Sequence, residues 1–263
     1  MPELFDVPLE DRVIDQVAGD LRREPARRRI RAYFNGVAVA DSVEALLVMR
    51  ARHMPVYYFP VSDVRMDLLA DSGRTASEGK ALLDLSVGGK DARGAAWSSP
   101  DLPGFIAFYW KTMEAWFEED EEVYVHPRDP YHRVDVLHSS RHVRVEVLGG
   151  TVAESSRPCL LLETNLPPRW YLPKQDVHLD KLVHSSTTSQ CPYKGKASYY
   201  SVRSGGQLIH DIAWSYRFPV PECPKIENMI CFFDEQVDAV YVDGVRQERP
   251  TTAWSRPAKI TPL

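Results

Sequence analysis

The strongest constraint on the fold is that the chain contains one pattern of residues twice. Both copies open with a segment in which apolar and polar residues alternate around a glycine, and the later blocks follow in the same order. A chance match would not persist through so many ordered blocks, so the sequence predicts two copies of one domain. The aligned blocks are residues 30–42 with 143–155, 56–69 with 169–182, 78–81 with 194–197, 95–98 with 212–215 and 106–117 with 230–241.

Each copy has the residue pattern of a β domain. The segment RVEVLGGTVAES of the second copy alternates apolar and polar side chains around a Gly-Gly turn, which indicates a hairpin. The aromatic segments VYYFP and RWYLP are typical of short strands, each ended by a proline that cannot donate to a ladder. We therefore predict an all-β fold, with one helical turn capped by Asp63 in the first copy and by Asp176 in the second.

One substantial helix is predicted, before the first copy, where Val13, Ile14, Val17 and Leu21 fall on one face. The chain is long enough for two domains of ordinary size in addition to this helix. The predicted boundaries are an N-terminal helical extension at 1–27, a first repeat at 28–125, a linker strap at 126–140, a second repeat at 141–248 and a C-terminal tail at 249–263.

The linker strap contains His126, Asp129 and His132 at spacings that metal ligands can have. Pro127 and Pro130 instead favour an extended segment over a helix that presents ligands on one face. The four cysteines all lie in the second half of the chain, and none forms a Cys-x-x-Cys pair. We therefore predict no bound metal, reduced thiols and a cytoplasmic protein.

Charge and hydropathy exclude several classes of partner. The formal net charge of −5 argues against a general nucleic-acid binder, which is usually basic. No stretch approaches the 18 or more apolar residues that a membrane span requires. The N-terminal segment contains no uninterrupted apolar region of the kind found in secretory signals. The expected partner is therefore a small molecule, with neither nucleic acid nor membrane.

The aligned blocks resemble a family known as domain of unknown function 427. Its loose pattern contains Gly-x-x-Val-Ala-x-Ser, Tyr-Tyr-x-Pro-x-x-Asp-Val, Cys-Pro-x-Lys-Gly-x-Ala-x-Tyr and Ala-Trp-Ser-Tyr, and the second copy carries these four blocks at 149–155, 170–177, 191–199 and 213–216. The resemblance covers nearly the whole chain and implies two tandem copies of a compact β-tent-like domain. Other β-tent domains usually hold zinc with paired Cys-x-x-Cys motifs, which this sequence lacks. The family has also been labelled nucleotidyltransferase-like, but the Gly-Ser helix start with paired aspartates is absent from this sequence.

The two copies differ most at the Cys-Pro-x-Lys-Gly block, and this difference places the predicted site in the second copy. Lys194 stands where the first copy has Glu78, and an ammonium group near Cys191 would favour the nucleophilic thiolate. Lys194 is also a candidate clamp for an anionic group, while the wall of a binding pocket and packing of the turn are the alternatives for Cys191. His210 and Asp211 are candidate acid–base groups. The candidate ligand-binding residues, with core packing as the alternative, are Tyr171, Tyr199, Tyr200, Trp214 and Tyr216.

These residues lead to a functional hypothesis. The chain is expected to be a soluble small-molecule-binding protein and an acid–base enzyme without a cofactor, such as a cyclase, dehydratase, isomerase or hydrolase of a small organic or natural-product substrate. Two alternatives stay open: a non-catalytic ligand-binding or scaffold protein whose repeats form an internal pseudo-dimer, and a nucleotide-handling enzyme. The ligand is expected in the second copy, and the first copy is expected to contribute at most a wall.

Overall fold

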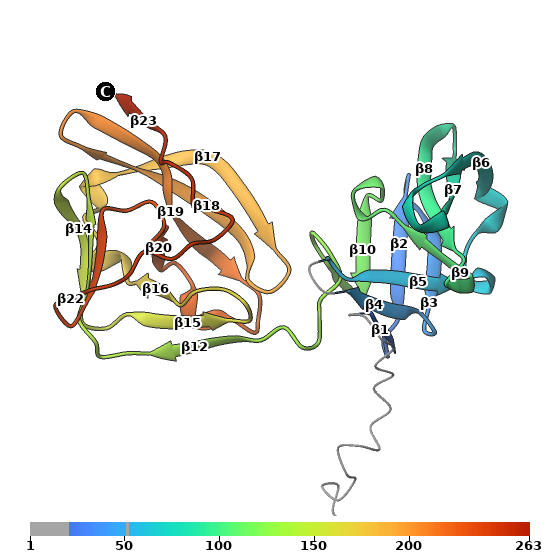
Figure 1. Ribbon diagram of the computed structural model, residues 1–263, viewed down its shortest axis with the longest axis horizontal. Coiled ribbons are helices and arrows are strands. Elements are labelled where there is room, and N and C mark those ends of the chain that lie inside the picture. The colour runs from blue at the N-terminus through green and yellow to red at the C-terminus, as the bar shows by residue number, and fades with distance from the viewer. Residues whose placement is uncertain (1–20, 51–52) are drawn as a thin grey trace, which may run out of the picture. The chain divides into compact units, whose positions relative to one another are not determined.

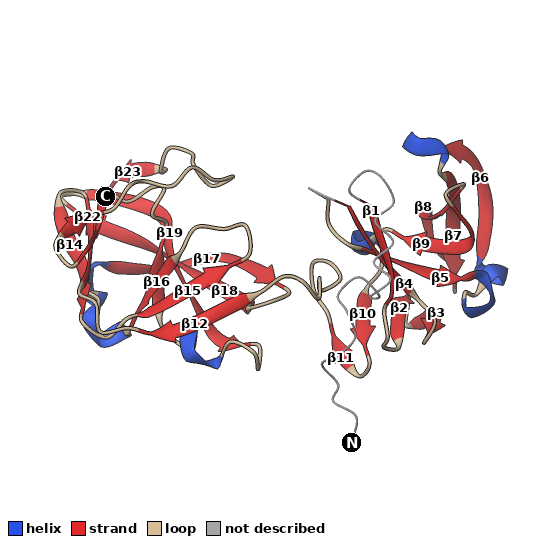
Figure 2. Cartoon of the chain, turned by 60° about the horizontal axis from the view of Figure 1, so that its bottom comes forward, coloured by secondary structure: helices blue, strands red, loops and turns tan. Residues whose placement is uncertain are grey.

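The computed structural model describes residues 21–50 and 53–263, and the chain divides into two compact units at Asp129 and Pro130. Both units consist of antiparallel strands (Figure 1). Short 3-10 turns connect some of these strands (Figure 2). The predicted all-β fold and the tandem repeat are therefore confirmed.

The first unit contains a seven-stranded and a four-stranded sheet. The larger sheet has the strand order β1 (Leu21–Pro25), β4 (Leu46–Arg50), β5 (Val56–Pro60), β9 (Leu102–Phe108), β8 (Lys90–Ser99), β7 (Ala81–Val87), β6 (Leu69–Thr75). The smaller sheet has the order β11 (Glu121–Glu122), β10 (Ala115–Glu118), β2 (Ile30–Phe34), β3 (Val37–Ser42). Its 3-10 turns are η2 (Val61–Asp63), η3 (Met66–Leu68), η4 (Ser77–Gly79) and η5 (Trp110–Thr112).

The second unit repeats this topology strand by strand. Its larger sheet has the order β12 (Val134–His138), β15 (Cys159–Glu163), β16 (Arg169–Leu172), β20 (Ile230–Phe232), β19 (Gln207–Pro219), β18 (Gly195–Ser204), β17 (Leu182–Cys191), and β23 (Ile260–Pro262) also pairs with β19. Its smaller sheet has the order β14 (Gly150–Ser155), β13 (Val143–Val147), β21 (Ala239–Val242), β22 (Val245–Arg246). Its 3-10 turns are η6 (Lys174–Asp176), η7 (Leu179–Lys181) and η8 (Pro224–Ile226).

In each unit the larger sheet has two apolar faces. Because side chains alternate along a strand, Tyr57 and Phe59 of β5 belong to the main core of the first unit, while Tyr58 belongs to a second, smaller cluster. The main core also contains β2 and β3 of the smaller sheet, so it lies between the two sheets. We call the other face of the larger sheet the outer face; it carries Tyr58 and Trp97 in the first unit.

The units extend beyond the predicted boundaries. Most of the predicted N-terminal helix lies outside the described residues, but its end is not helical, because Leu21–Pro25 forms β1 and pairs with β4. Part of the predicted linker strap is likewise a strand, since Val134–His138 forms β12 and pairs with β15. In the predicted C-terminal tail, β23 joins the larger sheet. These three segments are strands because their backbones pair with a neighbouring strand. The periodicity of the local sequence does not contain this information.

Asp63 and Asp176 have equivalent structural roles, but the prediction that they cap a helical turn is wrong. Each ends a 3-10 turn, and the turns that follow have no side-chain cap. Asp63 accepts a hydrogen bond of 2.6 Å from Ser42 Oγ, and Asp176 accepts one of 2.7 Å from Ser155 Oγ. Both aspartates therefore fasten a turn to a strand of the smaller sheet.

The ladders correct the alignment of the two copies at one strand. The sequence blocks place Ala81 over Ala197, but Ala81 pairs with Ser98 and the corresponding partner of Ser215 is Ser198. An irregular register between Gly195 and Ala197 in β18 takes up the extra residue. Alignment by residue type alone does not detect such a bulge.

Candidate functional site

The outer face of the first unit is built around a tyrosine and a tryptophan. Trp97 Nε1 donates a hydrogen bond of 3.2 Å to the Tyr58 hydroxyl, and the two rings meet edge to face with centroids 6.1 Å apart. Both side chains are almost buried, at 6% exposure. The hydrogen bond satisfies both polar groups within an apolar surround, which fixes the orientation of the two rings.

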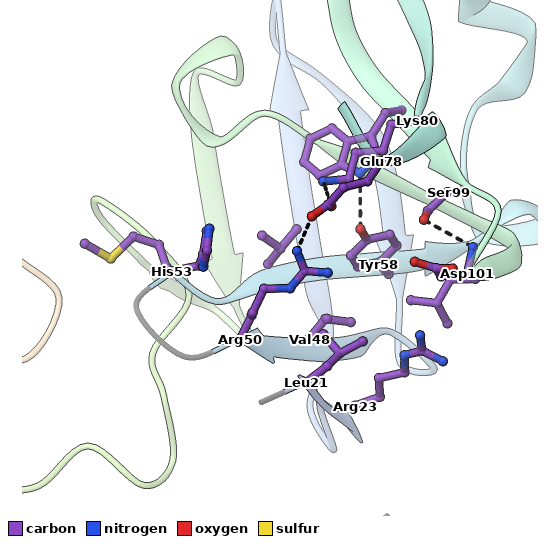
Figure 3. A pocket seen from close by; sticks show the side chains of 14 residues that line it. Leu21, Arg23, Val48, Arg50, His53, Tyr58, Glu78, Lys80, Ser99 and Asp101 are labelled. Carbon is purple, nitrogen blue, oxygen red and sulfur yellow. Dashed lines mark hydrogen bonds and ion pairs between the residues drawn. The ribbon is translucent and has the colours of Figure 1, made fainter. Parts of the chain in front are cut away.

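A cavity of about 190 Å³ opens over this aromatic pair (Figure 3). Its apolar walls come from five strands and a neighbouring loop, so residues far apart in the sequence contribute to it. The apolar lining comprises Leu21, Val48, Met54, Val56 and Leu102, in addition to the rings of Tyr58 and Trp97. A concave apolar site with a small number of polar groups is the usual form of a small-molecule site.

The polar groups of this cavity are mostly charged. Glu78, in the turn η4, forms ion pairs with Arg50 at the end of β4 and with Lys80, whose Nζ lies 2.9 Å from a Glu78 oxygen. Hydrogen bonds from Lys80 and Arg50 lower the pKa of Glu78 to about 2. Arg23 and Asp101 also line the cavity. Figure 3 shows Arg50, Glu78 and Lys80 converging near Tyr58.

The second unit has the same aromatic pair at the same place. Trp214 Nε1 donates to the Tyr171 hydroxyl at 3.1 Å, and the ring centroids are 6.3 Å apart at an edge-to-face angle of 88°. Phe233 lies against Trp214 with centroids 4.5 Å apart, as Tyr109 lies against Trp97 at 4.4 Å. The pair therefore belongs to the common fold, and it does not by itself distinguish a ligand site.

The ion pair is also repeated, with its charges reversed. Glu163, the last residue of β15, pairs with Lys194 in the turn before β18, whereas Arg50, the last residue of β4, pairs with Glu78 in the turn before β7. The second pair is nearly buried, with 10% and 7% of the Lys194 and Glu163 side chains exposed. His132 Nε2 also lies 3.0 Å from Glu163. Lys194 is thus engaged by a buried carboxylate.

A segment of the second unit covers its outer face. The connection from β19 to β20 is long, and we call residues 220–229 the plug. Cys223 and Ile226 of the plug are buried in one cluster with Tyr171 and Trp214. In the first unit only Pro100 and Asp101 separate β8 from β9. Among the described residues, the first repeat therefore has no counterpart of the plug over its outer face, whereas the plug fills that face in the second repeat.

Backbone hydrogen bonds hold the plug beside the Cys-Pro-Tyr-Lys-Gly turn. Val220 donates to the Lys194 carbonyl at 3.2 Å, and Asn228 donates to the Tyr216 carbonyl at 2.8 Å. Gly195 has a φ of +101°, and a Cβ there would lie 3.1 Å from the Phe218 carbonyl oxygen. The lysine and glycine of this motif thus have structural tasks in the second repeat: one neutralises Glu163 and the other permits close approach of the chain.

The structure separates the predicted catalytic residues into two groups. Cys191 is the last residue of β17 and precedes the turn that contains Lys194. This turn lies beside the C-terminal end of β19, where Val220 is hydrogen-bonded to Lys194. Asp211 instead lies eight residues before Pro219, the last residue of β19. At about 3.3 Å per residue, roughly 25 Å of strand separates Asp211 from that end. Asp211 accepts a hydrogen bond of 2.8 Å from Thr187, while His210 Nε2 lies 2.9 Å from Thr261 Oγ1 of β23. These four side chains do not form one site.

The predicted aromatic residues are also divided, between the two faces of the sheet. Tyr200 packs against the main core of the second unit, because it points to the opposite face from its neighbour Tyr199. The remaining four lie in the outer-face cluster with the plug, and these are Tyr171, Tyr199, Trp214 and Tyr216. In this cluster burial strongly raises the pKa of Tyr171 and Tyr216.

Sequence reasoning missed a buried ionic group of the second unit. Arg169 donates to both carboxylate oxygens of Glu235, at 2.8 and 2.5 Å, and its Nη1 lies 3.8 Å from Asp234. Burial raises the pKa of Asp234 to about 7. Asp234 also lines a cavity of about 210 Å³ together with Arg246. The aligned positions of the first copy hold Val56, Trp110 and Lys111, so the available signal was that only the second copy combines an arginine with two carboxylates.

The described residues contain neither a metal-binding cluster nor a membrane-spanning helix. In residues 21–50 and 53–263, no group of three or more His, Cys, Asp or Glu side chains is arranged to hold a metal ion. Over the same residues, no helix has the length and apolar character to span a bilayer.

Comparison with known proteins identifies the repeats. A family model described as a domain of unknown function (DUF427) matches the chain twice, at residues 22–119 and 135–243. Each match begins in the first strand of a repeat, β1 or β12, in agreement with the structural units. No curated protein matches the chain. Because the two matches together cover most of the sequence, the chain belongs to the DUF427 family and contains two tandem copies of its domain.

Proposed function

We propose that the protein binds a small organic molecule in the outer-face cavity of the first repeat. One observation carries this proposal: within residues 21–50 and 53–263, a cavity lies over Tyr58 and Trp97 at the place where the second repeat has its plug. The second repeat demonstrates that the fold can fill this face with its own side chains. An unfilled apolar hollow with converging charged groups is the feature expected of a ligand site.

This proposal moves the site from the repeat that the sequence favoured. The plug is hydrogen-bonded to the Lys194 carbonyl, and an anionic ligand at the Lys194 ammonium would have to displace the buried Glu163. Leaving a buried carboxylate unpaired is costly. In the first repeat the corresponding ion pair is more exposed, with 36% of the Arg50 side chain and 43% of the Glu78 side chain accessible. Groups at that pair can therefore rearrange around a ligand.

Acid–base catalysis is a second candidate function, and Asp234 favours it. A carboxyl group with a pKa near neutrality can both donate and accept a proton at physiological pH. Asp234 lies beside Arg169 and lines a cavity, which is the setting in which perturbed groups often serve catalysis. Measuring the Asp234 pKa by carboxyl carbon NMR tests this candidate; a value near 4 would remove its support.

The ligand-binding proposal is tested by blocking the cavity. Val48 lines the cavity on β4, so Val48→Trp should fill it, whereas Val43→Trp adds the same side chain at an exposed position outside the lining. Amide NMR spectra would be recorded with a library of small organic molecules of mixed charge, with ATP and GTP included. We expect hits to shift resonances of Tyr58, Trp97 and Glu78 in the wild-type protein and in Val43→Trp, but not in Val48→Trp.

Two results would reject the proposal. The first is a set of hits that shift only resonances of the second unit. The second is full retention of binding by Val48→Trp. Tight binding of ATP or GTP with neither base nor phosphate near Trp97 would instead favour a nucleotide-handling role at another site.

A further inference from the structure

The cavity of the first repeat contains a carboxylate of the protein itself, held between two cations. Glu78 pairs with Arg50 from one side and with Lys80 from the other. The Lys80 ammonium also lies 6.0 Å from the centroid of the Trp97 ring, so the carboxylate position adjoins the aromatic wall. A carboxylate position next to an aromatic surface is a combination that an arene carboxylate would match.

Glu78 can leave this position. Its side chain is 43% exposed, and it lies in a turn of only three residues, Ser77–Gly79. Its backbone has a φ of +61° and a ψ of +27°, the left-handed region that costs a residue with a Cβ conformational energy. A change of this turn to a right-handed conformation would remove that conformational cost and would reposition the Glu78 side chain.

The charges around the cavity would then favour an incoming anion. With Glu78 withdrawn, the lining retains the cations Arg23, Arg50 and Lys80 against the single carboxylate of Asp101. An arginine guanidinium binds a carboxylate through two parallel hydrogen bonds, and Lys80 supplies a second cation. A ligand carboxylate would restore the charge balance that Glu78 maintains in the empty cavity.

We propose that the ligand of the first repeat is a planar organic carboxylate, whose carboxylate group replaces that of Glu78 between Arg50 and Lys80. Its ring lies against Trp97 and Tyr58, between the apolar side chains of Val48 and Leu102. Glu78 thus acts as an internal competitor that occupies the anion position until the ligand arrives. This inference rests on the proposed function and adds the chemical class of the ligand.

The test compares three probes of nearly the same shape: benzoate, benzamide and benzylamine. Binding to the full-length protein is measured by amide NMR titration at pH 7, where benzoate is anionic, benzamide neutral and benzylamine cationic. We expect benzoate to bind at least ten-fold more tightly than benzamide, and benzylamine to bind more weakly still. The resonances of Arg50, Lys80 and Trp97 should report the benzoate titration.

Variants then separate the roles of the charged residues. Arg50→Gln should weaken benzoate binding at least ten-fold, because it removes the bidentate partner. Glu78→Gln should strengthen benzoate binding several-fold, because it removes the competing charge while keeping a side chain of the same shape. Asp67→Asn is the matched control: it removes an exposed carboxylate that pairs with Arg65 outside the cavity, and it should leave binding unchanged.

The outcomes distinguish this inference from the function on which it rests. Equal affinities for benzoate and benzamide, with the cavity resonances shifting, would overturn the carboxylate assignment and leave small-molecule binding intact. Weaker benzoate binding by Glu78→Gln would show that Glu78 assists the ligand and would overturn the competitor role. If neither these probes nor any member of the mixed library shifts the cavity resonances, the proposed function fails and this inference fails with it.

Discussion

The two repeats have the same strands and the same Tyr–Trp pair, yet their outer faces differ in nearly every other respect. In the first repeat this face is an open cavity bordered by exposed charges, and in the second it is a core closed by the plug. The ion pair at its edge is present in both, with opposite polarity and different burial. The comparison shows that the motif richest in chemically reactive residues, Cys-Pro-Tyr-Lys-Gly, lies in the repeat whose outer face is filled.

The largest expected difference between the repeats concerns the two ion pairs. Lys194→Ala leaves Glu163 buried without its ammonium partner and should reduce the free energy of unfolding of the second unit by about 3–5 kcal/mol. Arg50→Ala at the exposed counterpart should cost the first unit about 0–1 kcal/mol. Urea denaturation, with hydrogen exchange to assign the loss to one unit, measures both. If the two variants lose similar unfolding free energy, the two ion pairs do not differ in their contribution to stability.

Burial of the plug's apolar side chains should add to the free energy of unfolding of the second unit alone. Ile226 is fully buried against the outer-face cluster, so Ile226→Ala should destabilise the second unit by about 2–4 kcal/mol. Leu102→Ala, on the rim of the open cavity, should cost less, about 1 kcal/mol, because its side chain is already partly exposed. If Ile226→Ala lowers the free energy of unfolding only slightly, the plug packs loosely against the outer face. The outer face of the second repeat would then again be a candidate ligand site.

Asp234 should make the stability of the second unit depend on pH near neutrality, and the aligned residue of the first copy is Trp110, which does not ionise. Burial raises the pKa of Asp234 to about 7, so the folded state holds a proton that the unfolded state releases near pH 4. Stability therefore falls as the pH rises from about 4 to 7, and the loss is complete above the folded-state pKa.

Asp234→Asn should remove this dependence and stabilise the second unit at pH 8 by about 1–3 kcal/mol relative to the wild-type protein. Thermal unfolding between pH 4 and 8 would test this expectation. A stability of the second unit that rises over this range in the wild-type protein would contradict it.

The smallest expected difference is at the glycines of the two turns. Gly195→Ala should destabilise the second unit by about 1–3 kcal/mol, because it combines a φ of +101° with close approach to the Phe218 carbonyl. Gly79 also has a positive φ, but a Cβ there would lie 3.5 Å from Pro100 Cγ, which is an ordinary contact distance. Gly79→Ala should therefore cost about 1 kcal/mol. Equal costs would show that the backbone conformation alone decides both.

Local patterns in the sequence predicted most of the fold. Alternation along segments such as 143–155 located strands and faces, and the aligned blocks located both repeats. The segments that became β1 and β12 were assigned otherwise, because an edge strand is defined by its partner, β4 or β15, more than by its own residues. Pairing of this kind depends on contacts distant in sequence, which local patterns do not contain.

The candidate site was less predictable, for two physical reasons. Arg50 and Glu78 come together across the outer face although three strands separate β4 from β7 in the sheet, so only the three-dimensional course of the sheet reveals the contact. The plug appeared in the alignment as extra length between Ser215 and Ile230, but length alone does not say where a segment packs. The opposite changes of charge at Arg50/Glu163 and Glu78/Lys194 were a usable signal of pairing.

The reversed polarity of the ion pairs has a consequence for how a chain with two like halves reaches its native state. During folding, similar repeats on one chain can exchange elements and become trapped in a misassembled form. Exchange of the two turns would place Arg50 beside Lys194 and Glu163 beside Glu78, and like charges repel in both hybrids. The opposite polarities of the two ion pairs thus disfavour exchange between the repeats. Each turn pairs favourably only with the strand of its own half of the chain.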